Sequence, residues 1–393
     1  MKNIPLFKVF MSDESIRRSA EVLSSGYIGE GAQVKQFEND LKQYFKTNYE
    51  DIITCNSATS AEHLIYHMLK SDQILEIKVE NTLITDYWPA AKGSTVLTTP
   101  LTCTATNWPI LLNDYKIKWV DVNPGNMNID LDDLQSKIDE NTRIIQIVHW
   151  GGYPVDMDRL NLIVKNAERK YFQKILVIED CAHAFGARYK SQMVGFTGNI
   201  STFSTQAIKH ITTIDGGFLT SPYHTFNKKA RLLRWYGIDR DAGRTDFRCE
   251  GDIPDLGFKF HMNDVSAAVG IGNLRCAKFI IESHKFNSNF YDSELEGVDG
   301  VTLLNRDPWA EEAAWLYTMK VERRDDFMKH MESCGISVSR VHERNDKHSS
   351  LVQYKTDLPM LESFIDNMIC IPVGWWLNTE EVDYIVECIK KGW

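Results

Sequence analysis

The stretch KILVIEDCAHAFGA, residues 174–187, sets the fold class of this chain. It opens with aliphatic and β-branched residues, which are typical of a buried strand, and Asp180 follows directly. Helical patterns separate it from four similar runs: IITC at 52–55, STVLTTP at 94–100, YKIKWVDV at 115–122 and RIIQIVH at 143–149. This alternation predicts a largely parallel α/β sheet.

The helical segments support two domains. DESIRRSAEVLSSG, residues 13–26, carries apolar residues at helical spacing and should end at Gly26. After about residue 265 the pattern changes to one long helical stretch, from Asn263 to about Leu295, followed by mixed strands and helices. We therefore expect a large α/β domain over residues 1–262 and a smaller α+β domain over residues 263–393.

The composition excludes several classes of partner. The 393 residues, 43% of them hydrophobic, can form a large core. The 44 basic against 54 acidic residues give a net charge of −10, with no long basic run. General attraction to nucleic acid or to an anionic membrane is therefore not expected, and an anionic ligand must be held locally.

The cysteines indicate a reducing compartment. They form no CxxC pair and no metal-finger spacing, so we expect reduced, mostly buried thiols and no metal site. The first residues lack the apolar core of a signal peptide, and no segment has the roughly 18 apolar residues that span a bilayer. We expect a cytoplasmic protein. The eight cysteines are Cys55, Cys103, Cys181, Cys249, Cys276, Cys334, Cys370 and Cys388.

Polar clusters follow four of the expected strands. They are NSATSAEHL, TPLTCTAT, HWGGYP and EDCAH, after the strands near 52–55, 94–100, 143–149 and 174–180. Ligands of open α/β sheets collect at the carboxyl ends of the strands, so these clusters predict one site.

Each cluster offers a distinct chemical role. NSATS precedes a helix, whose amide N–H groups and hydroxyls could hold a phosphate. Asp180 could pair with a protonated ring nitrogen. Lys209, in FSTQAIKHITTIDGGF at 203–218, could form an imine with a carbonyl carbon. A phosphate cradle, a carboxylate and an imine-forming lysine together describe a pyridoxal phosphate (PLP) site.

The motifs also resemble a known family in their order. IPLF, SGYIGEGAQVKQFE, NSATSA, EDCAHAFGA, FSTQAIKHITTIDGG, GFKFHMNDVSAA and IPVGWWLNTEEVDYI extend over nearly the whole chain. Together they resemble the DegT/DnrJ/EryC1/StrS sugar aminotransferases, within fold type I of the PLP enzymes. The resemblance implies a three-layer α/β/α large domain with a seven-stranded, mainly parallel sheet and a smaller C-terminal domain. It also implies a homodimer in which each active site borrows residues from the other subunit.

The resemblance implies roles for residues around the cofactor. Lys209 would form the imine, Asp180 would face the ring nitrogen, and His183 would lie near the phenolic oxygen of the ring. Cys103, in TCTAT, stands where relatives often carry an aromatic ring that stacks on the cofactor. The phosphate would be held by Thr59, Ser60 and Ser204, with Lys259 or His261 of the partner subunit closing the pocket.

Further residues are candidates for binding the substrate. They are Tyr27, Glu30, Arg344, Asn345 and Trp375. The implied reaction moves an amino group from L-glutamate to a nucleotide-linked keto-deoxy sugar for glycan or polysaccharide biosynthesis. It would pass through pyridoxamine phosphate (PMP) and release 2-oxoglutarate. Amination at C4 of a 4-keto-6-deoxyhexose is preferred, whereas C3 amination and the nucleotide, dTDP, UDP, GDP or CMP, stay open.

Other functions require residues that differ from these. A dehydratase of the same family replaces the lysine with histidine, whereas here Lys209 is kept and His210 follows it. A nicotinamide-dependent oxidoreductase needs a GxGxxG turn after an early strand, which this sequence lacks. A binding protein without catalysis would have little reason to keep Lys209 and Asp180 together.

Overall fold

The structure is a computed structural model that describes residues 3–49, 51–79, 82–242, 246 and 251–393. Cys249 lies outside the described residues. The other seven cysteines are unpaired, and Cys55, Cys181, Cys370 and Cys388 are buried. Within the described ranges, no helix has both the length and the apolar character needed to cross a bilayer.

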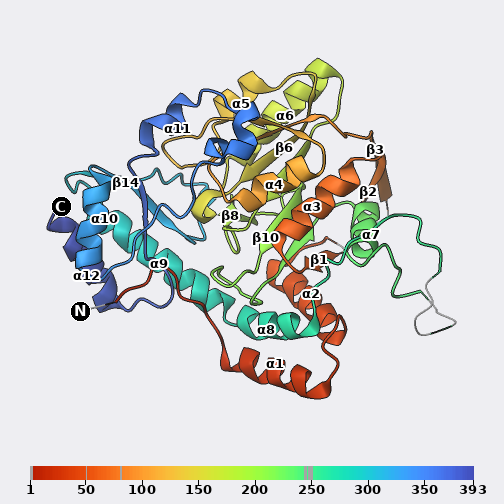
Figure 1. The fold of residues 1–393 in the computed structure, drawn as a ribbon, viewed down its shortest axis with the longest axis horizontal. Coiled ribbons are helices and arrows are strands. Elements are labelled where there is room, and N and C mark those ends of the chain that lie inside the picture. The colour runs from red at the N-terminus through yellow and green to blue at the C-terminus, as the bar shows by residue number, and fades with distance from the viewer. Residues whose placement is uncertain (1–2, 50, 80–81, 243–245, 247–250) are drawn as a thin grey trace.

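A seven-stranded sheet forms the centre of the molecule (Figure 1). Its order is β1-β11-β10-β7-β6-β4-β5, and β11 runs in the opposite direction to the other six strands. The strands are β1 (Ile52–Cys55), β4 (Thr95–Thr98), β5 (Lys116–Trp119), β6 (Thr142–Val148), β7 (Leu176–Asp180), β10 (Ile200–Ser204) and β11 (Gly217–Thr220). The predicted mainly parallel sheet is confirmed.

Helices cover both faces of this sheet. Successive strand residues point to opposite faces, so Val177 and Ile178 enter two different buried clusters. The Val177 face is covered by α2 (Ala32–Phe45), α5 (Leu131–Lys137), α6 (Met157–Tyr171) and α8 (Asp264–Leu274). The Ile178 face is covered by α3 (Ala58–Leu69), α4 (Thr104–Leu112) and α7 (His224–Leu233). The three-layer α/β/α prediction is therefore confirmed.

The antiparallel strand β11 determines where Lys209 lies. Because β10 and β11 run in opposite directions, the segment between them begins and ends at the carboxyl edge of the parallel strands. The backbone N–H of Thr205 donates to the carbonyl of Gly216 over 3.0 Å, and the carbonyl of Thr205 accepts from the N–H of Thr213 over 2.8 Å. A Cβ on Gly217 would lie 2.3 Å from the Ala58 nitrogen, so glycine is needed where β11 approaches α3. Lys209 and the start of α3 thus share one edge of the sheet.

Two helices replace the single long helix predicted over 263–295, so that prediction was wrong. Helix α8 ends at Leu274, and α9 begins at Ala277 and runs to Leu295. Cys276 takes φ −95° and ψ 3°, which interrupts the helical backbone. The break lets α8 pack against α1 (Asp13–Ser25) and α2, while α9 continues toward the C-terminal part. Helix α1 ends at Gly26 in a left-handed conformation, as predicted.

A second, smaller sheet lies at the end of α9. It is antiparallel, in the order β12 (Val301–Thr302), β14 (Tyr317–Val321) and β15 (Met368–Ile371). Helices α10 (Arg324–Ser333) and α12 (Thr379–Lys390) share a buried cluster with it. This sheet supports the expected C-terminal domain, but since α8 packs in the large domain, the boundary at 262/263 stays a prediction.

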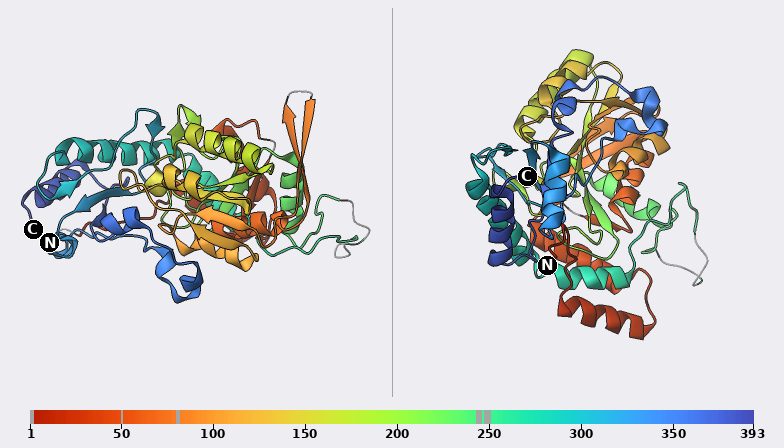
Figure 2. Two further views of the ribbon diagram at one scale, coloured as in Figure 1. Left: turned by 90° about the horizontal axis from the view of Figure 1, so that it is seen from above. Right: turned by 60° about the vertical axis from the view of Figure 1, so that its left-hand side comes forward.

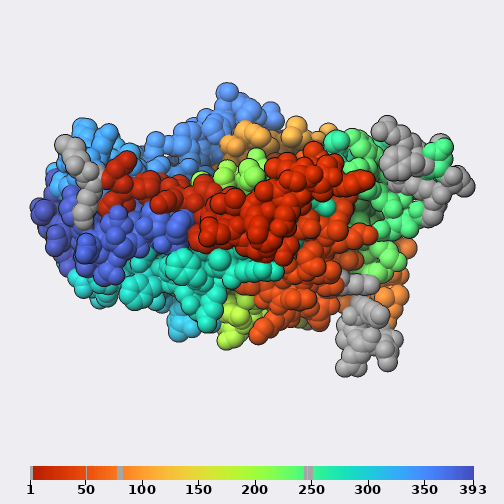
Figure 3. Space-filling view, turned by 90° about the horizontal axis from the view of Figure 1, so that it is seen from below, coloured from red at the N-terminus to blue at the C-terminus, as the bar shows by residue number. Residues whose placement is uncertain are grey.

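The N-terminal segment contacts the C-terminal part of the chain before it reaches the large domain. Ile4 forms a bridge with Ile336, and the Nε1 of Trp376 donates to the carbonyl of Pro5 over 3.1 Å. From there the segment runs along the C-terminal part to α1 (Figure 3). The first residues of the chain are therefore fixed by some of the last.

Three smaller features complete the fold. After β14 the chain returns to the large domain, where α11 (Pro359–Phe364) packs in the cluster of the Ile178 face. Strands β8 (Arg188–Tyr189), β9 (Gln192–Met193) and β13 (Ala310–Glu311) form a short sheet. Strands β2 (Gln73–Val79) and β3 (Thr82–Trp88) form a hairpin that projects from the body (Figure 2).

Candidate active site

Asp180 lies at the carboxyl edge of the sheet, as predicted from the strand ends, and Lys209 lies at the same edge. The Nζ of Lys209 is 3.5 Å from the ring centroid of Trp315. Loss of water around this amine lowers the pKa of Lys209 to about 8, although the nearby Asp180 and Cys103 act in the opposite direction. An amine with this pKa is partly unprotonated near neutral pH, as a nucleophile or base must be.

Asp180 is buried at the end of β7 and is held by neutral donors. Its Oδ1 accepts from the backbone N–H of Ala182 over 2.9 Å, and its Oδ2 accepts from the Oγ1 of Thr106 over 2.7 Å. Thr106, the last residue of the TCTAT stretch, is also 2.8 Å from Thr102 through their hydroxyls. These contacts fix the carboxylate without neutralising it, which suits a partner for a protonated ring nitrogen.

A second buried carboxyl group, that of Glu62, lies on the same face of the sheet. Its Oε1 accepts from the Oγ1 of Thr202 over 3.2 Å, and Thr202 is the strand neighbour of Asp180. Burial, followed by the charge of Asp180, raises the pKa of Glu62 well above its ordinary value. Burial therefore favours the uncharged form of Glu62.

The start of α3 has a capped first turn at the place where the sequence predicts a phosphate cradle. Ser57 caps the helix, and its Oγ accepts from the backbone N–H of Ser60 over 3.0 Å. Thr59 is exposed in the first turn, and Ser204 lies at the nearby end of β10. Ser57 was absent from the predicted residues, although a serine before a helical pattern is a common cap and could have been found.

The segment 257–264 runs beside this cradle in its own subunit. The backbone N–H of Asn56 donates to the carbonyl of Phe260 over 2.7 Å, and Cys55 forms a bridge with His261. The ring of His261 lies 3.4 Å from that of Trp235, while Lys259 is exposed. A contact of either side chain with the phosphate of another subunit stays a prediction.

Four rings form a column beside Lys209. Phe7 stacks on Trp315 at 5.3 Å, Trp315 on His183 at 4.0 Å, and His183 on His342 at 5.4 Å. The N–H of Gly151 donates to Nδ1 of His183 over 3.4 Å, so Nε2 carries the hydrogen and donates to Nε2 of His342. Burial lowers the pKa of His183 well below its ordinary value and that of His342 to about 3.

Cys103 and Asn345 are brought together from distant parts of the chain. Cys103 precedes α4 and is partly exposed, and its carbonyl accepts from the Nδ2 of Asn345 over 3.3 Å. The backbone N–H of Asn345 donates to the carbonyl of Pro100 over 2.8 Å. Arg344, in contrast, donates twice to its neighbour Asp346, over 2.7 and 2.6 Å.

The other substrate candidates lie in different surroundings. Tyr27 is 85% exposed. Glu30 accepts from the buried Arg234 over 2.7 Å, within an ion-pair network. Trp375 packs edge-on against Phe10 of the N-terminal segment, with 4.9 Å between the ring centroids. Their roles in substrate binding stay predictions.

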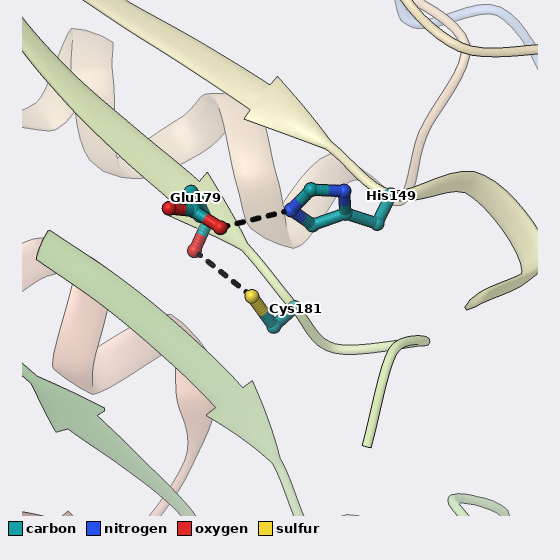
Figure 4. Close-up of side chains that lie close together, drawn as sticks. All are labelled: His149, Glu179 and Cys181. Atoms are coloured by element: carbon teal, nitrogen blue, oxygen red, sulfur yellow. Dashed lines mark hydrogen bonds and ion pairs between the residues drawn. The ribbon is translucent and has the colours of Figure 1, made fainter. Parts of the chain in front are cut away.

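Glu179, His149 and Cys181 form a buried cluster (Figure 4). Glu179 precedes Asp180 on β7, so the two side chains point to opposite faces of the sheet. The Nδ1 of His149 accepts from the N–H of Val155, so Nε2 carries the hydrogen and donates to Glu179 over 3.1 Å. The other contacts of Glu179 are also donors: Gly195, Thr197 and Asn199. Both histidine nitrogens are thus in use, which makes this cluster a hydrogen-bond network that supports β7, rather than a metal centre.

Comparison with known proteins places the chain in a family. Residues 10–390 match the model of the DegT/DnrJ/EryC1/StrS aminotransferase family. The chain belongs to this family. Members are PLP-dependent sugar aminotransferases of fold type I, so the predicted family, fold and enzyme class are confirmed.

Individual relatives are similar over almost their full length. The sugar aminotransferase CalS13 from Micromonospora echinospora has 40% identity and a TM-score of 0.90, with 99% of this chain and 100% of that chain covered. Spr1654 from Streptococcus pneumoniae, solved in its PMP form, has 26% identity and a TM-score of 0.86. The match covers 99% of this chain and 98% of that chain. The UDP-4-amino-4,6-dideoxy-N-acetyl-β-L-altrosamine transaminase of Campylobacter jejuni is 28% identical, with 92% of each chain covered.

Proposed function

We propose that this member of the family uses PLP to move an amino group from L-glutamate to C4 of a nucleotide-linked 4-keto-6-deoxyhexose, for glycan or polysaccharide biosynthesis. The observation that carries the proposal is that Lys209, the buried carboxylate of Asp180 and the start of α3 lie at one edge of the sheet. The Campylobacter relative is named for a 4-amino sugar, which supports C4 over C3.

The described residues fit the cofactor. Asp180 accepts only from neutral donors, so its charge remains available for a cationic ring nitrogen. The first turn of α3, with Thr59 and Ser60, offers a helix N-terminus to the phosphate, and Ser204 lies close by. Once bound, PLP would supply an electron sink for the electrons released at the amino-acid Cα.

Lys209 and Asp180 would divide the proton chemistry. The Nζ of Lys209, when unprotonated, would accept the proton from Cα of glutamate and later return a proton to the sugar carbon. Asp180 would keep the proton on the ring nitrogen, since its carboxylate favours the cation. Both side chains are held in place, which lowers the cost of orienting them in each step.

His210 is not positioned to replace Lys209, which argues against the alternative of a dehydratase. Its side chain is buried, and its Nε2 donates to the carbonyl of Ala313 over 2.9 Å. Burial lowers the pKa of His210 well below its ordinary value. The imidazole of His210 is therefore engaged in a hydrogen bond to the backbone. The amine of Lys209 is the group available for proton transfer.

A substrate panel tests the proposal. Purified enzyme with PLP should release 2-oxoglutarate from glutamate only with an accepted keto sugar, offered as dTDP, UDP, GDP and CMP derivatives of 3-keto and 4-keto deoxysugars. NMR of the product should place nitrogen on C4. Nitrogen on C3 would correct the position alone, whereas no turnover with any nucleotide sugar would refute the proposed substrate class.

The proposed homodimer can be tested by mixing two inactive variants. Lys209→Ala removes the amine from one subunit, and a double variant, Lys259→Ala with His261→Ala, removes the basic side chains of the other. If these side chains complete the neighbouring site, each mixed dimer regains one intact site, and random mixing restores about a quarter of wild-type activity. Activity that stays at the level of the separate variants would contradict shared sites, as would a fully active monomer in sedimentation.

We also propose that the enzyme acts in the cytoplasm. The seven described cysteines, from Cys55 to Cys388, are unpaired thiols. Such thiols persist in a reducing compartment.

A further inference from the structure

The residues on either side of Lys209 are hydrogen-bonded to Trp315 and to Ala313, which lies two residues before it. The Nε1 of Trp315 donates to the carbonyl of Ile208 over 2.9 Å. In the reverse direction, the Nε2 of His210 donates to the carbonyl of Ala313 over 2.9 Å. These two hydrogen bonds flank the lysine and the indole, so the two side chains are held in a fixed relation.

A third hydrogen bond secures the backbone that carries the indole. The Nδ1 of His284, from α9, donates to the carbonyl of Ala314 over 2.8 Å. Ala314 has φ 50°, a conformation that L residues rarely adopt and that needs support from its surroundings. Two hydrogen bonds thus hold residues 313–315 against the segment that carries Lys209, and a third holds them against α9.

The indole of Trp315 presents its ring to the amine. At 3.5 Å from the centroid, the Nζ of Lys209 is well inside the roughly 6 Å range of a cation–π contact, and tryptophan is the best partner for one. The indole is 2% exposed and stacks on His183, so the contact lies away from bulk water. Such desolvated contacts are at the stronger end of the range.

We propose that Trp315 is a positioning residue for the amine of Lys209. Its ring holds the amine whenever the lysine is not joined to the cofactor. The hydrogen bonds from Trp315 to Ile208 and from His210 to Ala313 keep the ring and the lysine in the same relative position. The inference rests on the proposed function, in which this amine moves the protons. Trp315 thereby joins the C-terminal part of the chain to the chemistry of the large domain.

The titratable groups around the amine are compatible with this role. Asp180 on β7 and Cys103 before α4 favour the ammonium form. Three histidines also face it, but burial lowers their pKa values, so none adds a positive charge: His183, His210 and His342. A ring that attracts the ammonium raises the pKa of Lys209 against the effect of burial. Loss of that attraction should therefore lower the pKa further.

The test measures the titration of Lys209 in the cofactor-free protein. Brief labelling with acetic anhydride over a range of pH, with mass spectrometry of the peptide that carries Lys209, gives its apparent pKa. We expect a value of about 8 in the wild type. In Trp315→Leu it should fall by roughly half a unit to one unit. Trp315→Phe, which keeps a π face, should retain most of the wild-type value.

Two further variants make the result decisive. Trp376→Phe is the matched control. It removes a different indole, whose Nε1 donates to the carbonyl of Pro5 in the wild type, and it should leave the titration of Lys209 unchanged. Fluorinated tryptophan at position 315 weakens the ring quadrupole with little change in shape, so it also tests the proposal if Trp315→Leu does not fold. The pKa of Lys209 should then fall as fluorines are added.

A pKa of Lys209 that is the same in wild type, Trp315→Leu and the fluorinated series would overturn the inference. Its failure is separable from that of the proposed function. Absorbance of the wild type with added PLP reports whether Lys209 joins the cofactor, and this measurement does not involve Trp315. If the wild type binds PLP through Lys209 but the pKa of Lys209 is the same in the Trp315 variants, the proposed function stands. Trp315 then has no part in it.

Discussion

Lys209→Ala is expected to lower kcat of the amino transfer by at least about 10³-fold, because the variant lacks the amine that moves protons to and from carbon. Binding of PMP should persist, because Thr59, Ser60 and Asp180 do not depend on the lysine. Release of 2-oxoglutarate measures turnover, and calorimetry with PMP measures binding. Lys190→Ala, which removes a surface lysine paired with Asp158, is the control and should behave as wild type.

The same variant offers a structural measurement. Given PLP and the amino sugar product, Lys209→Ala should retain both, because the amine that would release the sugar is missing. Crystals should show which sugar carbon bears nitrogen, and so decide between C3 and C4. Substantial turnover by Lys209→Ala would remove the lysine from the mechanism, and His210 could not explain it while its Nε2 is engaged with Ala313.

Asp180→Asn is expected to lower kcat/KM by about 10²- to 10³-fold, because a neutral amide cannot hold a proton on the ring nitrogen. Some cofactor should remain bound through the phosphate cradle. The matched control is Glu62→Gln, on the same face of the sheet. Burial and the charge of Asp180 raise the pKa of Glu62 well above its ordinary value, which favours the uncharged carboxyl, so the amide should give activity close to wild type.

Steady-state kinetics of Asp180→Asn and Glu62→Gln distinguish the effect of the charge of Asp180 from the effect of altered packing. A large loss in Asp180→Asn alone supports the role of the ionised carboxylate. Equal losses in both variants would indicate that the buried polar cluster, rather than the charge of Asp180, sets the activity. Wild-type kinetics in Asp180→Asn would exclude Asp180 from the reaction.

The parts of the fold that depend on local pattern were predictable from sequence. Strand β1 coincides with the IITC run, and the helix before Gly26 ends at the left-handed residue that glycine favours. The strand-end rule brought Asp180 to the same edge as the start of α3, and Lys209 completed a PLP site as the imine-forming lysine, a role that the family resemblance also implied. These inferences succeed because each rests on residues that are close in the chain or on the direction of a strand.

The parts that depend on distant contacts were not predictable. Trp315 and His342 carry no sequence signal, and they reach Lys209 and His183 only because the chain returns to the large domain after α9. Arg344 was a reasonable candidate for an anionic substrate, yet a carboxylate two residues away already accepts its hydrogen bonds. The break at Cys276 follows from the packing of α8 on α1, which no local pattern contains.

The ring column has a consequence for biosynthesis of the protein itself. Its members, Phe7, His183, Trp315 and His342, extend almost from one end of the chain to the other. A nascent chain can fold its central sheet as the strands emerge, but Phe7 has no indole to stack on until Trp315 has left the ribosome. Closing contacts of such high sequence separation is slow, so the catalytic amine should acquire its surroundings last. A ribosome-bound chain that ends before Trp315 can therefore possess Lys209 and Asp180 without possessing a finished active site.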